Sequence, residues 1–342
     1  MVKKKTKGTR RSVGLEFDTG SLRAVEMVGN AAASKLANLG SITLPKEAVK
    51  EGLILQPKVV GSALKELWSK AGLKERNVLL GVFNQGVLVR YITIPKVSPD
   101  KIKNAINFQA EEQLPISLSS VVLDYIVLGE TEGTGEGPVQ LEILLVAARR
   151  DMLDIFLEAL SIANLEALDI DVASIAMMHL LPQKALSMTV AVVNVANGLN
   201  SILIMANGKP YLSRLGMAKI NDLAEGLGCP LEDVFSSSVI NYEKPTQLLD
   251  NWINNLASEV RSSINYYQDQ TQMSRVEGVL LSGRGAFLNG LSAQLESYLN
   301  IPVRLFNPLK EYNPSKRRLL NTDHEAIEYA ISAGLAQRGL EG

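Results

Sequence analysis

A glycine-rich turn between a predicted strand and a predicted helix is the stretch of the chain best suited to chemistry. Apolar residues from Val276 to Leu281 predict the strand, and Ser282-Gly283-Arg284-Gly285-Ala286 form the turn. A helix is expected to follow at once, with Leu288, Leu291 and Leu295 on one side. Because glycine has no Cβ, the backbone N–H groups of such a turn can approach an anionic or ribosyl ligand closely. The same turn would also suit ordinary helix-on-strand packing, and the pattern alone leaves both interpretations open.

The elements that position this turn belong to a strand–turn–strand pattern that occurs twice in the chain. Glu16 precedes Asn194 by the same number of residues that separates Gly29 from Asn207. A repeat at this separation predicts two related domains that face each other. The expected strands of the two copies are 13–17, 22–28 and 35–43, then 189–195 and 200–205.

Composition limits the class of protein. A chain of 342 residues that is 46% hydrophobic can form about two domains. Its one cysteine, Cys229, excludes an intramolecular disulfide and favours a reducing compartment. His179 and His324 offer little material for a histidine-rich metal site or a Ser-His-Asp triad. No apolar run approaches the roughly 18 residues of a membrane-spanning helix, and no signal peptide is recognised. We therefore expect a cytoplasmic protein.

Positive charge is concentrated at the N-terminus, although the net charge is −1. A solvated tail is one interpretation of this segment. The other is attraction to an anionic membrane surface, worth about 1 kcal/mol for each Lys or Arg held near it. The acidic remainder of the chain disfavours nucleic acid as a partner. The basic residues of the tail are Lys3, Lys4, Lys5, Lys7, Arg10 and Arg11.

Helical periodicity and capping residues mark the remaining elements. A helix over Pro57–Lys70 should stop at Gly72, and Ser98-Pro99-Asp100 should open a helix that Pro115 ends. A polar, glycine-rich loop at 129–138 predicts an exposed hairpin tip. Strands are expected to flank it at 121–128 and 139–147, with further helices at 151–164, 248–267 and 323–337.

These elements divide the chain into four parts. Residues 1–11 are expected to be a basic flexible tail, and 12–94 a first domain that 167–186 and a C-terminal helix at 322–340 complete. The segment 95–166 has enough strands and helices for an inserted subdomain, and 187–321 forms the second domain.

Three stretches of the chain carry a resemblance to a known family. They are 13–26, 105–125 and 281–291, the last followed by Ile301-Pro302-Val303 and Asn307-Pro308. Together they resemble the actin/Hsp70/FtsA ATPase superfamily and, within it, the PilM family of type IV pilus assembly. The middle stretch, which includes Ala110-Glu111-Glu112-Gln113-Leu114-Pro115-Ile116, is the most discriminating. The resemblance implies an α/β, actin-like (ribonuclease H-like) two-domain fold with an FtsA-type inserted subdomain.

The resemblance also implies a cleft for ATP and Mg²⁺ between the two domains. The family's usual D-x-G falls on Glu16 and Asp18 in the first loop, and its second loop falls on Asn194 and Ala196. Glu16 and Asp18 would then lie nearest the metal. The residues implied to contact the cofactor are Glu16, Asp18, Thr19, Gly20, Ser21, Asn194, Ala196, Asn197, Gly283, Arg284, Gly285 and Ala286.

The residue types in this cleft argue against efficient ATP hydrolysis. An unshielded Asp18 carboxylate 4 Å from one phosphate charge would cost up to about 4 kcal/mol at an effective dielectric of 20. Ala196 adds a Cβ where close backbone approach is wanted, and Asn194 removes a charge that could orient a metal or water. A shift by two residues would make Asp18-Thr19-Gly20 the D-x-G of a shorter loop. We expect nucleotide binding to be weak or lost, and no catalytic residue is assigned.

The resemblance implies a protein partner as well. PilM-like proteins capture the cytoplasmic N-terminal peptide of PilN, a membrane protein, beside the inserted subdomain. Phe108, Leu114, Pro115 and Ile116 lie in the right part of the chain, although core packing and helix termination also explain them. The expected function is an adaptor at the inner face of the inner membrane, in contact with other pilus platform and motor proteins.

Three alternatives remain open on sequence. One is an ATP-binding, FtsA-like filament protein associated with membrane, and another is a component of a type II secretion platform. The third is a kinase of the superfamily, which would need a general base beside the second loop. Asn194 cannot act as one, and no acid follows it before Tyr211.

Overall fold

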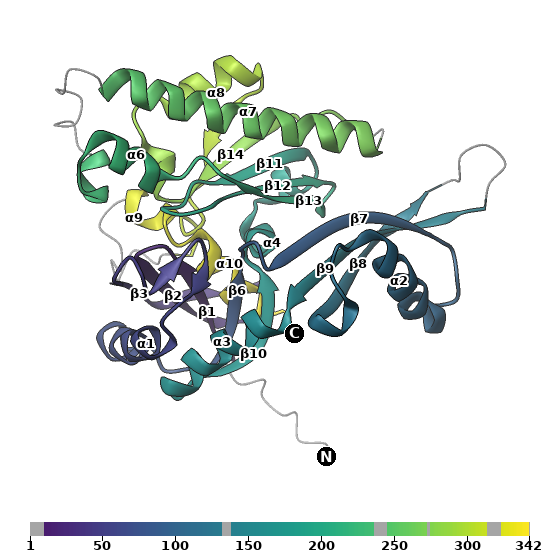
Figure 1. Ribbon diagram of the computed structural model, residues 1–342, viewed down its shortest axis with the longest axis horizontal. Coiled ribbons are helices and arrows are strands. Elements are labelled where there is room, and N and C mark those ends of the chain that lie inside the picture. The colour runs from purple at the N-terminus through teal and green to yellow at the C-terminus, as the bar shows by residue number, and fades with distance from the viewer. Residues whose placement is uncertain (1–9, 132–137, 236–244, 272–273, 313–322, 342) are drawn as a thin grey trace.

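The computed structural model describes residues 10–131, 138–235, 245–271, 274–312 and 323–341. Two five-stranded sheets in it share one topology, an antiparallel meander of three strands extended by two parallel strands (Figure 1). In the first sheet the order is β10 (Glu166–Val172), β6 (Asn77–Val82), β1 (Arg10–Asp18), β2 (Ser21–Gly29) and β3 (Lys35–Thr43). In the second it is β13 (Lys209–Gly216), β12 (Asn200–Ala206), β11 (Thr189–Asn194), β14 (Gly278–Ser282) and β15 (Val303–Leu305).

This shared topology confirms the repeat predicted from the turn positions. β1-β2-β3 and β11-β12-β13 have the same strand order and the same antiparallel pairing. β1 from Ser12 to Asp18 and all of β11 are buried, as strands covered on both faces should be. The ends of these two strands carry the two turns that the cleft was predicted to contain.

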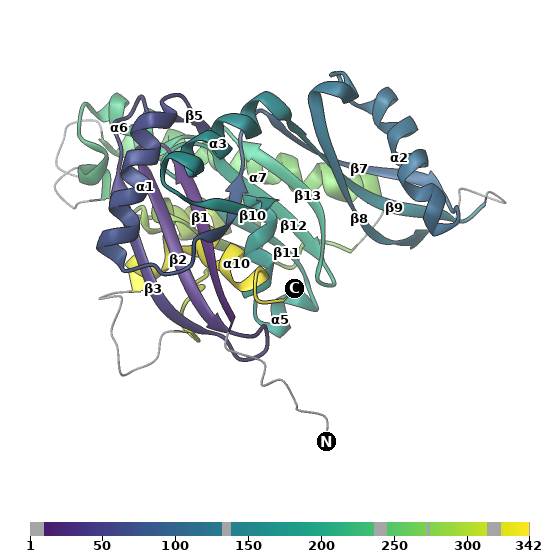
Figure 2. The same ribbon diagram turned by 90° about the horizontal axis from the view of Figure 1, so that it is seen from below.

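Helices cover both faces of the first sheet. α1 (Pro57–Ala71) and α3 (Arg150–Ile162) pack side by side on one face (Figure 2), and α1 begins and stops at the predicted Pro57 and Gly72. α10 (Ala330–Arg338) packs on the other face, where a Cβ on Gly14 would lie only 2.0 Å from the Ser332 carbonyl oxygen. The last helix was predicted as one segment but is two, because α9 (Asp323–Ile327) ends before α10 begins.

The second sheet carries the longest helix. α7 (Pro245–Thr271) packs on β12 and β13 and against α6 (Ile220–Leu227) and α8 (Leu291–Leu299). No helix among the residues described is long and apolar enough to cross a membrane. The short elements are β4 (Val49–Lys50), β5 (Leu53–Ile54), α4 (Ala173–Ala176), η2 (Met177–Leu180), α5 (Gln183–Leu186), η3 (Leu231–Phe235) and η5 (Arg284–Phe287).

A third sheet, with α2 (Pro99–Gln113) on one face, extends to one side of the two large sheets (Figure 1). Its order is β7 (Val87–Pro95), β9 (Gln140–Arg149) and β8 (Val121–Thr131), and η1 (Leu118–Ser120) precedes β8. It has a small core of its own, in which Ile106 and Ala110 of α2 contact Leu145 and Ala147.

The third sheet starts at Val87, ahead of the subdomain bound expected at residue 95, and α3 packs on α1 of the first domain. We propose 87–149 as the inserted subdomain. Arg10 and Arg11, assigned from sequence to the tail, are the first residues of β1, and Arg11 pairs with Glu26 at 3.1 Å. The rest of the tail, 1–9, and most of the predicted hairpin tip, 132–137, lie outside the described residues.

Candidate functional site

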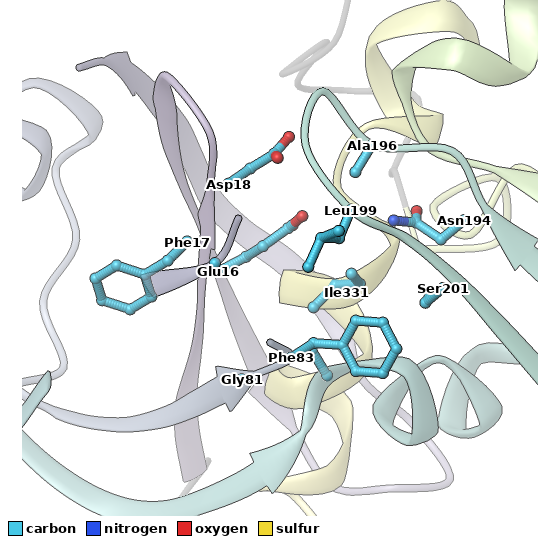
Figure 3. A pocket seen from close by; sticks show the side chains of 12 residues that line it. Glu16, Phe17, Asp18, Gly81, Phe83, Asn194, Ala196, Leu199, Ser201 and Ile331 are labelled. Carbon is cyan, nitrogen blue, oxygen red and sulfur yellow. The ribbon is translucent and has the colours of Figure 1, made fainter. Parts of the chain in front are cut away.

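The two meander turns meet between the large sheets. Asp18 ends β1 and pairs with Ser21 across a two-residue turn, in which Gly20 takes a φ of +76°. Its carboxylate points at the turn that follows β11 (Figure 3). The backbone N–H groups of Asn197 and Gly198 donate to its Oδ2 and Oδ1, each at 3.2 Å. Asp18 therefore links the first domain directly to the second.

A buried arginine holds the carboxylates of this region together. Nη1 of Arg23 lies 3.4 Å from Oε1 of Glu16 and 3.2 Å from Oδ2 of Asp18, and its Nε lies 3.7 Å from Glu328. Glu328 also lies 3.7 Å from Nε of Arg284, whose guanidinium stacks on Phe235. Burial raises the pKa of Glu16 to about 7, although the Arg23 charge opposes that shift. The guanidinium of Arg23 thus lies within ion-pair distance of three carboxylates.

The cavity between the described residues of the cleft is small. Its volume is about 30 Å³, and Glu16, Asp18, Asn194, Ala196 and Ser201 are among the residues that line it (Figure 3). Within the described part of the chain, Oε2 of Glu16 and Oγ of Ser201 have no hydrogen-bond partner. This volume suits a water molecule or two, whereas ligand pockets usually measure about 300–1,000 Å³.

The glycines of the turn at 282–286, called the late turn below, pack closely against Val195. A Cβ on Gly283, which has a φ of +80°, would lie 2.5 Å from the Val195 carbonyl oxygen, and one on Gly285 would lie 2.3 Å from Val195 Cγ1. The N–H of Gly285 donates to the same carbonyl at 2.9 Å. The late turn therefore supports the second meander turn from behind. The prediction that a helix carrying Leu288 follows this turn at once is wrong, because η5 comes first and α8 begins only at Leu291.

The structure thus gathers most of the predicted cofactor residues but fills the space between them. Glu16, Asp18, Thr19, Asn194, Ala196 and Asn197 meet in the cleft, and Gly283, Gly285 and Ala286 pack behind it. Nothing lies within 4 Å of a Cβ built on Gly20. Glu16 and Asp18, the two residues expected nearest a metal, share one guanidinium. Among the described residues no three His, Cys, Asp or Glu side chains gather as a metal site.

Four charged residues of the cleft, Glu328 among them, were not identified from sequence. Arg23 pairs directly across the meander with Glu16, so opposite charges in a strongly apolar strand pair could have pointed to it. Nζ of Lys219 lies 2.5 Å from Oε1 of Glu51 and bridges the domains at the rim. The N–H of Glu51 donates to Oγ1 of Thr19 at 3.1 Å. Glu51 and Lys219 are far apart in sequence and carried no local signal.

A groove separate from the cleft lies beside the inserted subdomain. It has a volume of about 760 Å³ between the third sheet, α3 and the edge strand β10. Leu168 stands in it with 64% of its surface exposed, because a bulge lifts it out of the register between Ala167 and Asp169. Further lining residues are Val122, Asp124, Val146, Ala148, Arg150, Leu153, Asp154, Leu157 and Asp171.

The predicted peptide-binding residues lie on the other side of the third sheet. Leu114 and Ile116 pack with Leu145 and Ala147, whereas the groove is lined by Val146. Neighbouring residues of a strand point to opposite faces. Phe108 and Pro115 are exposed on the α2 side as well. None of these four residues lines the groove.

Comparison with known proteins agrees with this architecture. The family described as type IV pilus assembly protein PilM matches residues 14–340. A solved chain of a PilM–PilN type IV pilus biogenesis complex is 25% identical, with a TM-score of 0.82 over 97% of this chain and 99% of that chain. The ethanolamine utilization protein EutJ from Carboxydothermus hydrogenoformans, 14% identical with a TM-score of 0.55 over 96% and 89%, shares the fold.

MreB5 of Spiroplasma citri bound to AMPPNP is more distant, 10% identical with a TM-score of 0.48 over 95% and 94%, and no inference rests on it. The predicted actin-like two-domain α/β fold is confirmed. The family match covers nearly the whole chain. The chain belongs to the PilM family of type IV pilus assembly proteins.

Proposed function

We propose that this chain is an adaptor of the type IV pilus platform, and that it binds the cytoplasmic N-terminal peptide of a PilN-like membrane protein in the groove beside β10. The observation that carries the proposal is the groove itself, with its volume of about 760 Å³ and its exposed apolar side chains. The family relative in the PilM–PilN complex covers 97% of this chain. A groove of this size can bury several side chains of an extended peptide.

Two edge strands border the groove, and the open edge of a strand carries backbone N–H and C=O groups that a peptide can pair with. β10 is an edge strand of the first sheet, and β8 is an edge strand of the third. On both strands an aspartate caps the N–H of the next residue: Asp124 caps Tyr125, Asp169 caps Ile170 and Asp171 caps Val172, at 2.7–2.8 Å. An extended peptide that displaced a cap could add as a further strand.

The charge of the groove favours a cationic peptide. Asp124 and Asp154 line it with one cation, Arg150, while Asp169 and Asp171 already pair with Arg338 at 2.7 and 3.1 Å. Short cytoplasmic segments of membrane proteins are enriched in Lys and Arg. Their positive charges, with the terminal ammonium, would meet these carboxylates. Binding should therefore weaken as salt concentration rises.

We place the adaptor at the inner face of the cell membrane, held by its partner. The basic residues from Lys3 to Lys7 would add attraction to anionic lipid, and other platform and motor proteins would complete the assembly. The proposed role does not require ATP hydrolysis, and the cavity between the described residues Glu16, Asp18 and Asn194 measures about 30 Å³. Peptide capture in a preformed groove needs no catalytic group.

Substitutions at two equally exposed residues test whether the peptide binds in the groove. Leu168 and Phe108 are both 64% exposed, one in the groove and one on α2. Fluorescence anisotropy with a labelled PilN-like N-terminal peptide should show Leu168→Glu weakening binding at least about tenfold, because an apolar contact is lost and a charge is desolvated. Phe108→Glu should leave the affinity unchanged. The reverse pattern would place the peptide on α2 and overturn the proposed groove.

A further inference from the structure

The turn after β11 holds an anion that belongs to the chain itself. Asp18 accepts the N–H of Asn197 and of Gly198 at 3.2 Å, and the N–H of Thr19 at 2.7 Å. Its side chain is only 6% exposed. Converging backbone N–H groups of this kind are how turns and helix starts bind phosphate. In this chain the position of the anion is taken by a carboxylate from the opposite domain.

The rest of that turn is already hydrogen-bonded within its own domain. The N–H of Val195 donates to Ser282 O at 2.8 Å, and that of Ala196 to Oδ1 of Asn200 at 3.1 Å. The carbonyl of Asn197 accepts the N–H of Asn221 at 3.2 Å. The turn is thus preformed, and the N–H groups it directs across the cleft are the two that Asp18 accepts.

We propose that Asp18 is a permanent internal anion, which occupies the place where an actin-like cleft would hold a nucleotide phosphate and fastens the two domains together without nucleotide. This proposal concerns the cleft and does not depend on peptide binding in the groove. Asp18, where the first loop departs from the usual D-x-G, would then have a structural role as the link between the two domains.

The residues present do not fit ATP and Mg²⁺. A Cβ on Gly198 would lie 2.4 Å from Oγ1 of Thr19, so the two turns leave no gap for a phosphate. A phosphate would have to take both N–H groups from Asp18. The displaced carboxylate would then stand beside it together with Glu16, with Arg23 shared among them. Like charges at such distances repel strongly in a buried site.

Amide hydrogen exchange tests the internal anion. In Asp18→Ala, the amides of Asn197 and Gly198 should exchange at least about tenfold faster than in the natural chain, because their acceptor is gone. Added formate or sulfate should slow exchange again in the variant, since a small anion can replace the carboxylate, and should leave the natural chain unchanged. Glu47→Gln removes an exposed carboxylate of the first domain and is the matched control.

The remaining results decide the proposal in either direction. Unchanged exchange in Asp18→Ala, or faster exchange that no anion reverses, would show that Asp18 is not an anion in a binding site. Asp18→Asn keeps the shape of the side chain with one acceptor oxygen, so it should give an intermediate rate of amide exchange. It replaces the alanine variant in this test if that variant does not fold. Independently, calorimetry of the natural chain with millimolar Mg²⁺ and ATP should show no binding, and binding would overturn the proposal. Peptide affinity measured on Asp18→Ala should stay unchanged, which separates this outcome from that of the groove.

Discussion

The cleft and the groove are two hollows of one chain with opposite contents. In the cleft, Glu16, Asp18 and Arg23 are at most 6% exposed and bond to one another, which leaves about 30 Å³. In the groove, Leu168 is largely exposed beside about 760 Å³ of open volume. A buried ion-paired cluster holds the walls of a cleft together, whereas exposed apolar groups gain free energy when a partner covers them. The contents of the cleft therefore fit a connection between domains, and those of the groove fit the partner binding that we propose.

Removing Arg23 should have the largest effect on this arrangement. Arg23→Met would leave the carboxylates of Glu16, Asp18 and Glu328 without their common cation, at a cost of about 3–5 kcal/mol in the free energy of unfolding. Urea unfolding followed by circular dichroism measures the loss. Arg304→Met is the control, since Arg304 is 70% exposed in its pair with Glu296 and should cost at most about 1 kcal/mol. Equal effects of the two variants would contradict the role given to Arg23.

The pH dependence of stability should show the burial of Glu16. Burial raises the pKa of Glu16 from 4.5 to about 7, so the folded chain retains a proton that the unfolded chain releases. The free energy of unfolding should therefore fall by about 3 kcal/mol as pH rises from 4.5 to 7. Glu16→Gln should lack this part of the dependence. Unfolding curves at pH 5, 6, 7 and 8 compare the two chains, and parallel curves would show that Glu16 ionises normally.

The bridge at the rim should contribute least. Lys219 and Glu51 have side chains 18% and 24% exposed, and they join the domains beside Thr19. Lys219→Met should lower the free energy of unfolding by about 1 kcal/mol, since water screens a partly exposed pair. Thermal unfolding detects a change of this size. A loss as large as that of Arg23→Met would shift the main connection between the domains from the buried cluster to the rim.

Local features of the fold could be predicted from sequence. β3 coincides with the predicted 35–43, and the proline and glycine at the ends of α1 mark its limits as expected. These elements are set by periodicity and by capping residues, which are properties of neighbours in the chain. The repeat was also visible, because its two copies keep the same spacing between turns.

What could not be predicted depends on contacts between distant segments. Asp18 was identified, but its acceptor role arises from the N–H groups of Asn197 and Gly198 in the other domain. The groove is formed by β8, α3 and β10, and Leu168 enters it through a bulge that no local pattern announces. Phe108 looked suitable because it lies in the resembling segment, yet α2 covers the opposite face of the sheet. Sequence periodicity locates elements, whereas a site at the junction of three of them requires their packing.

The central claim is that partner binding belongs to the groove and is independent of nucleotide. Calorimetric titration of the chain with a PilN-like N-terminal peptide, with and without ATP and Mg²⁺, tests this claim most directly. The account predicts one dissociation constant under both conditions, with no heat from nucleotide alone. Peptide binding that requires ATP would contradict it.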